Sequence, residues 1–112
     1  MNISNDVFQY LSQLGAHQKS IVEMYIHAAL ERFPNAHVDI KYGIPTLVDG
    51  KNLLHISGNH YHVGIYPGPI LVGWLKSLDN KIETSKGTWR IGYETQHPHP
   101  LFSQLLDQLK GL

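Results

Sequence analysis

The chain has 112 residues, the size of one domain with a single hydrophobic core, so we expect one domain over residues 1–112. Lys plus Arg equal Asp plus Glu at nine each, so no net field favours nucleic acid or an anionic membrane. The absence of cysteine excludes disulfides, thiolate catalysis and cysteine-held metal clusters. Neither a secretory leader nor a run of roughly 20 apolar residues is present, so a cytoplasmic location is expected.

Two helices are predicted at the N-terminus. Ser4 or Asn5 can cap a first helix, and Gly15 stands where a left-handed C-terminal cap is expected. Apolar residues in steps of three and four predict a second helix over about residues 18–33, which Pro34 ends. The apolar stripes of this helical hairpin need a sheet to cover them.

The middle of the chain predicts consecutive antiparallel strands. The first covers residues 37–42, is interrupted by Gly43 and Pro45, and resumes over 46–48. A hairpin signal at Asp49-Gly50 leads to a strand over about residues 51–57, and a turn at Gly58-Asn59 leads to one over 60–66. In this last strand the alternation assigns Tyr61, Val63 and Ile65 to the core, and His60, His62, Gly64 and Tyr66 to the opposite face.

The C-terminal third predicts a helix, a hairpin and a second helix. Pro67-Gly68-Pro69 opens the first helix, for which the expected inward residues are Ile70, Leu71, Trp74, Leu75 and Leu78. The hairpin comprises residues 81–84 and 88–94, with Trp89 and Ile91 toward the core and Arg90 opposite. The last helix follows Pro100. The predicted fold class is therefore α+β, with an N-terminal helical hairpin and further helices packed on one antiparallel sheet of about five strands.

Three ordered motifs resemble a known family. They are YGIP at residues 42–45, HVGIYP at 62–67 and SKGTWRI at 85–91, and this pattern is similar to the YdhG-like family, bacterial domain of unknown function 1801. The resemblance implies helices packed on one antiparallel sheet. It also implies an iron connection, because one member of the family is described as a frataxin-like intracellular iron chaperone. Two positions depart from the family pattern: His60 stands where a lysine is frequent, and Leu47 stands in place of an aromatic residue.

The non-core face of the predicted sheet gathers polar side chains. Those that we expect to line a ligand-binding cleft are Tyr42, His60, His62, Tyr66, Lys86 and Arg90. Cationic and hydrogen-bonding groups on one face suit a carboxylate or phosphate, with the guanidinium as a forked donor. A solvated sheet face without a ligand is the alternative.

Histidine spacing raises the question of a metal. His60 and His62 are two apart on a predicted strand, so both would point the same way toward a divalent ion, and His97 and His99 repeat the spacing. The sequence places no third ligand. Iron delivery of the frataxin type would use clustered carboxylates, whereas the acidic residues of this chain are dispersed.

No catalytic signature is present. The serines, Ser57 among them, lack a nucleophile-elbow context, and no phosphate-binding loop occurs. We therefore expect a non-enzymatic cytoplasmic binding protein with an unidentified ligand, either a small anion or a metal ion. The alternatives are a frataxin-like iron or other metal-handling chaperone, for which iron rests on the resemblance alone, and a homodimeric interaction module.

Overall fold

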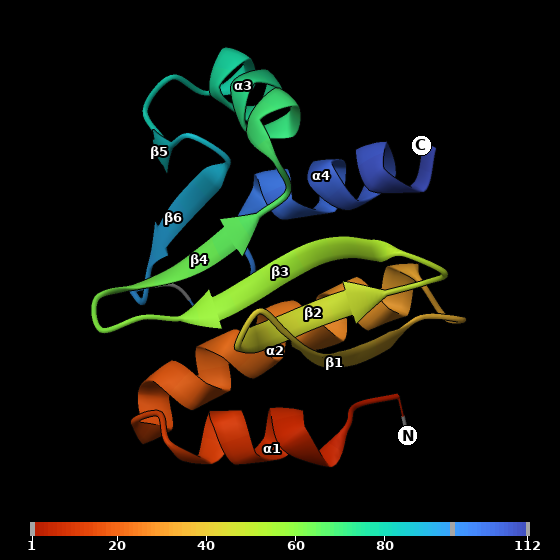
Figure 1. Cartoon of the computed structure of the whole chain (residues 1–112). Coiled ribbons are helices and arrows are strands. Elements are labelled where there is room, and N and C mark those ends of the chain that lie inside the picture. Colours follow the sequence, from red (N-terminus) through yellow and green to blue (C-terminus); the bar gives the residue numbers. More distant parts are fainter. Residues whose placement is uncertain (1, 95, 112) are drawn as a thin grey trace.

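The computed structural model describes residues 2–94 and 96–111, which form four helices and a six-stranded sheet (Figure 1). The helices are α1 (Asn5–Ser12), α2 (Ala16–Arg32), α3 (Pro69–Leu78) and α4 (Pro100–Gly111). The strands are β1 (His37–Lys41), β2 (Ile44–Val48), β3 (Asn52–Gly58), β4 (His62–Tyr66), β5 (Glu83–Ser85) and β6 (Thr88–Gly92). None of the helices described is long and apolar enough to cross a membrane.

All paired strands of the sheet are antiparallel, in the spatial order β1-β2-β3-β4-β6-β5. β6 lies between β4 and β5, so the chain leaves the sheet after β4, forms α3, and returns along the outer edge as β5. The predicted α+β class, with helices on one antiparallel sheet, is confirmed. The sheet has six strands rather than about five because residues 37–48 form two strands.

The first correction concerns Tyr42 and Gly43. Lys41 pairs with Ile44, so Tyr42 and Gly43 are the two central residues of a tight hairpin turn, with φ of 55° and 80°. Two positive φ values are the mark of a type I′ turn, whose twist matches that of the flanking strands. The expected interruption of one strand at Gly43 and Pro45 is therefore wrong.

The second correction concerns the start of β4. This strand begins at His62 rather than His60, and Asn59–Tyr61 form the loop that precedes it. The backbone N–H of Asn59 donates to the His62 carbonyl at 2.9 Å and closes the loop. Tyr61, expected in the core, is 80% exposed.

Two helix predictions also need correction. Gly15 has φ −61° and is the N-cap of α2, where the Gln18 side chain accepts its N–H, so it is not a left-handed C-terminal cap. Ile70 and Leu78 of α3 are exposed, and the buried residues of that helix are Val72 and Leu75. The predicted cap at Ser4 is confirmed, because its hydroxyl accepts the N–H of Val7.

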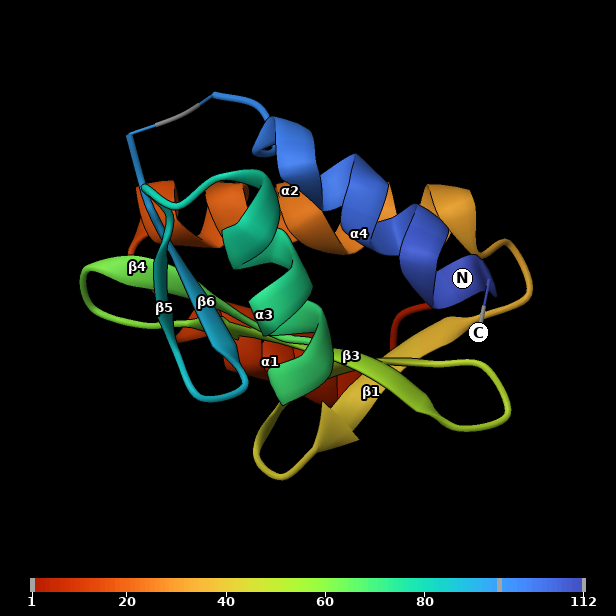
Figure 2. The same cartoon turned by 90° about the horizontal axis from the view of Figure 1, so that it is seen from above.

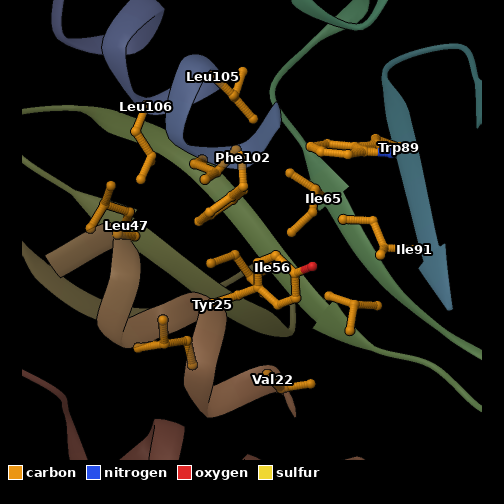
Figure 3. Packing of buried hydrophobic residues seen from close by; sticks show 14 of the residues in the cluster. Val22, Tyr25, Leu47, Ile56, Ile65, Trp89, Ile91, Phe102, Leu105 and Leu106 are labelled. Carbon is orange, nitrogen blue, oxygen red and sulfur yellow. The ribbon is translucent and has the colours of Figure 1, made fainter. Parts of the chain in front are cut away.

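The core lies between the sheet and the helices α2 and α4, which run side by side on the same face of the sheet (Figure 2). The Tyr25 ring of α2 meets the Phe102 ring of α4 edge-on, with centroids 4.9 Å apart, and both lie close to Ile56 and Ile65 of the central strands (Figure 3). No described helix lies in front of β3 and β4 on the other side of the sheet (Figure 1). That side is called the open face below.

Candidate functional site

The open face carries the side chains that alternate with the core residues. On β4 these positions are His62, Gly64 and Tyr66, of which Gly64 is itself buried beneath Ser57 and Tyr66, whereas Val63 and Ile65 face the helices. Ser57 of β3 pairs with Gly64, and Gly64 pairs in turn with Arg90 of β6. These cross-strand pairs place hydroxyl, imidazole and guanidinium groups on one surface.

A hollow of about 340 Å³ lies at the β6 end of the open face. The residues lining it are Tyr61, His62, Glu83, Arg90, Gly92 and Glu94. Gly92 pairs with His62 and has no side chain, and a Cβ atom there would overlap the Glu94 carboxylate. The missing side chain at residue 92 therefore allows the Glu94 carboxylate to lie against the strand beside the imidazole.

Arg90 and Glu83 face each other across the β5–β6 ladder. The Arg90 guanidinium donates from Nη1 to the Ser85 hydroxyl at 2.8 Å and from Nη2 to the Thr84 carbonyl at 3.3 Å. Both acceptors are neutral, and a guanidinium has further N–H groups, so Arg90 keeps donors for a ligand. Its two contacts with β5 hold its position.

A hydrogen-bonded chain connects three residues of the open face with the loop before β4. The Asn59 amide nitrogen lies 2.9 Å from Ser57 Oγ and 3.2 Å from His62 Nε2. Ser57 Oγ lies 3.0 Å from the Tyr66 hydroxyl. His62 and Tyr66, two of the predicted site residues, are thus linked through Asn59 and Ser57.

The predicted site residues do not all meet. His62 and Arg90 line the hollow, whereas Tyr66 of β4 is not among its lining residues and places its hydroxyl over Gly64. Tyr42 is 88% exposed in the β1–β2 turn, where its ring meets the ring of His55 with centroids 5.6 Å apart. His60 is exposed in the loop with its ring against Tyr61, and Lys86 is exposed in the β5–β6 turn.

The two histidine pairs do not lie as the metal hypothesis expected. His60 is outside the strand, so the strand alternation does not align it with His62. His99 belongs to the start of α4, where its Nδ1 accepts the N–H of Leu101 at 3.1 Å. Among residues 2–94 and 96–111, no three His, Asp or Glu side chains are grouped so as to hold a metal ion.

The fold can be compared with solved structures. A crystal structure of a protein from the DUF1801 family, from Bacillus subtilis, superposes with a TM-score of 0.80 and 18% sequence identity, over 93% of this chain and 88% of that chain. This chain has the DUF1801 fold. No protein-family profile matches the sequence, and no curated protein matches it either.

All three motifs that suggested the resemblance occupy defined places in this fold. YGIP is the β1–β2 turn and the start of β2, HVGIYP is β4 with the Pro67 that follows it, and SKGTWRI is the β5–β6 hairpin. Sequence reasoning missed four polar residues of the open face: Ser57, Asn59, Glu83 and Glu94. Glu83 could have been predicted from the strand register, since it pairs with Arg90, but the sequence did not show where β5 begins and ends. Asn59 was read only as a turn residue.

Proposed function

We propose that the chain is a small cytoplasmic, non-enzymatic binding protein of the YdhG-like, DUF1801 type. Its ligand is a small polar molecule seated in the hollow between β4, β5 and β6. The observation that carries this proposal is the lining of the hollow, where a guanidinium, an imidazole, a phenol ring and two carboxylates meet on a face that no described helix covers. A few convergent polar groups in a concave site are typical of small-molecule binding.

The charges of the residues that line the hollow narrow the class of ligand that we propose. Sequence analysis left a small anion and a metal ion both open, the anion on the basis of Arg90 and the other cationic and hydrogen-bonding groups of the sheet face. The structure adds Glu83 and Glu94 to the same hollow, so one guanidinium faces two carboxylates. A simple anion would be repelled by the carboxylates, and we therefore propose a ligand that carries both an oxyanion for Arg90 and a cationic group for Glu83 and Glu94.

A metal ion is the second candidate. His62, Glu83 and Glu94 line one hollow, and imidazole with carboxylate is a donor set that Zn²⁺ and Fe²⁺ accept. Their side chains do not form a ready-made cluster. Metal binding would need the carboxylates to move, and the iron connection comes only from the family resemblance.

Isothermal titration calorimetry separates these candidates. We would titrate the protein with γ-aminobutyrate, which carries both charges, with butyrate and butylamine, which carry one each, with phosphate, and with Zn²⁺ and Fe²⁺. The hollow is open, so we expect a dissociation constant for γ-aminobutyrate on the order of 1 mM, about −4 kcal/mol. Butyrate and phosphate should bind at least tenfold more weakly.

Matched variants assign the binding to the hollow. Arg90→Gln should weaken γ-aminobutyrate binding about tenfold, the effect of a charge-assisted hydrogen bond, and Glu83→Gln with Glu94→Gln should do the same. Glu31→Gln, an exposed carboxylate on α2, is the control and should change nothing. Saturable metal binding that is lost in His62→Ala would instead support the metal candidate, and the absence of any response would overturn both.

A further inference from the structure

The Asn59 amide determines which nitrogen of His62 carries the proton. An amide nitrogen donates hydrogen bonds and cannot accept them. The Asn59 amide nitrogen lies 3.2 Å from His62 Nε2, so Nε2 must be the accepting, unprotonated nitrogen of a neutral ring. The proton of His62 is then on Nδ1, and the ring presents an N–H donor that Asn59 does not use.

Ser57 determines the hydrogen-bond role of Tyr66 in the same way. Ser57 is 2% exposed, and its oxygen already accepts from the Asn59 amide at 2.9 Å. A buried hydroxyl must also find an acceptor for its own hydrogen. The Tyr66 hydroxyl at 3.0 Å is that acceptor, which leaves the phenolic hydrogen of Tyr66 directed away from Ser57.

Gly64 makes this arrangement sterically feasible. It lies between His62 and Tyr66 on β4, and a Cβ there would lie 2.6 Å from Ser57 Oγ and 2.7 Å from the Tyr66 hydroxyl. A side chain at residue 64 would separate Ser57 from Tyr66. The absence of one lets the Tyr66 ring and hydroxyl lie over residue 64, whose cross-strand partner is Arg90.

We infer that Ser57 and Asn59 fix the hydrogen-bond roles of His62 and Tyr66, so that both present donors on the same face as the Arg90 guanidinium. The ligand of the proposed function, on which this inference rests, then lies in one orientation. Its oxyanion end, a carboxylate or a phosphate, lies against the Arg90 guanidinium and the His62 imidazole, on the side of the hollow toward the Tyr66 hydroxyl that covers Gly64. Its cationic end lies toward Glu83, two strands away from Gly64 and next to Arg90 in the ladder. Ser57 and Asn59 are positioning residues in this arrangement and do not touch the ligand.

The first test needs no ligand. Nitrogen-15 NMR of the imidazole rings in the free protein reports which nitrogen is protonated, and we expect His62 to be the Nδ1–H tautomer near neutral pH. In Asn59→Asp the new carboxylate accepts from the ring, so the proton should move to Nε2. A wild-type His62 protonated on Nε2 would show the opposite amide orientation and overturn the inference, whatever the protein binds.

The second test measures the oxyanion end by calorimetry. Tyr66→Phe removes the hydroxyl, and Ser57→Ala removes its orienting partner, so each should weaken γ-aminobutyrate binding about five- to twentyfold while leaving butylamine unchanged. Ser77→Ala, on the exposed surface of α3, is the matched control. Ser57 is buried, so if Ser57→Ala does not fold, the affinity of Tyr66→Phe alone tests the donor role of Tyr66. Equal affinity of Tyr66→Phe and wild type for γ-aminobutyrate would overturn the donor role of Tyr66. A wild-type protein that does not bind γ-aminobutyrate would overturn the proposed function, but the tautomer of His62 measured by NMR would still stand.

Discussion

At the scale of single residues, His99 illustrates how the fold selects a protonation state. Its ring packs edge-on against Trp89, with centroids 5.0 Å apart, and its Nδ1 accepts the N–H of Leu101 at the first turn of α4. Burial lowers the pKa of His99 below its ordinary value, and the Asp79 carboxylate opposes this only in part. The positive end of the helix dipole also disfavours an imidazolium at this position.

The lowered pKa of His99 predicts a loss of stability in acid. A folded pKa below the unfolded one means that the unfolded chain takes up the proton more readily. The stabilisation is therefore complete above the unfolded imidazole pKa of about 6.5 and is lost as the pH falls through that value toward the folded one. His55, whose pKa is also lowered by burial, adds to the loss.

His99→Asn checks this prediction, because asparagine keeps a helix cap but does not titrate. Urea unfolding at about pH 7.5 and about pH 5 should show that the free energy of unfolding falls less in this variant than in the wild type. An equal fall in both proteins would show that His99 does not contribute to the pH dependence.

At the residue scale, the alternation of side chains along the strands predicted correctly the face on which some of the candidate site residues lie. It placed His62, Tyr66 and Arg90 on one face, because each lies in a strand whose neighbours are buried aliphatic or aromatic residues. It failed for His60 and Tyr61, because the loop before β4 is three residues long and no local signal fixed its length. Strand alternation could not predict the hydrogen-bond role of His62, because that role depends on the Asn59 amide in the loop before β4.

At the scale of elements, the β1–β2 turn depends on one glycine. Gly43 has φ of 80°, and nothing lies within 4 Å of the position of a Cβ atom. Gly43→Ala should therefore destabilise the protein by about 1 kcal/mol through backbone strain alone. Gly73→Ala is the matched control, since Gly73 lies inside α3 with equally open surroundings.

The control should change stability in the opposite direction. Alanine within a helix is favoured over glycine by about 0.5–1 kcal/mol, so Gly73→Ala should stabilise the protein. Chemical denaturation of the two variants measures both effects. A destabilisation of equal size in both would show that steric crowding, and not backbone conformation, governs the two sites.

The sequence predicted the helices better than the turns. Apolar residues at a spacing of three and four predicted α2 to within about two residues and the presence of α4 after the His97–Pro100 segment, because these helices bury one continuous stripe. The Tyr42-Gly43 turn was missed because the first position of a type I′ turn is usually Asn, Asp or Gly, and tyrosine with positive φ is uncommon there. The exposed Ile70 could not be foreseen from periodicity, because α3 packs at one end of the sheet against β6 and α4 (Figure 1).

At the scale of the whole molecule, the two edges of the sheet offer little backbone for pairing with a second copy. The outer edge of β1 is covered by the N-terminal segment, in which the Val38 N–H donates to the Asn2 carbonyl at 2.7 Å and the Ser4 N–H donates to the Val38 carbonyl at 3.0 Å. The other edge is β5, which has three residues. Covered and very short edges oppose strand-to-strand association.

We therefore expect a monomer, although sequence analysis left a homodimer open. Light scattering at two concentrations should give a mass near 12.7 kDa at both. A mass of about twice that value, or one that rises with concentration, would contradict this expectation and point to association through the open face.

The central claim is that a ligand with both charges sits in the hollow of the open face. The most direct measurement is a titration of the nitrogen-15-labelled protein with γ-aminobutyrate, followed by backbone amide chemical shifts. The account predicts saturable shifts at residues 59–66 and 83–94, and none along the exposed face of α2. Shifts confined to the helical side of the sheet, or the absence of saturable shifts, would contradict it.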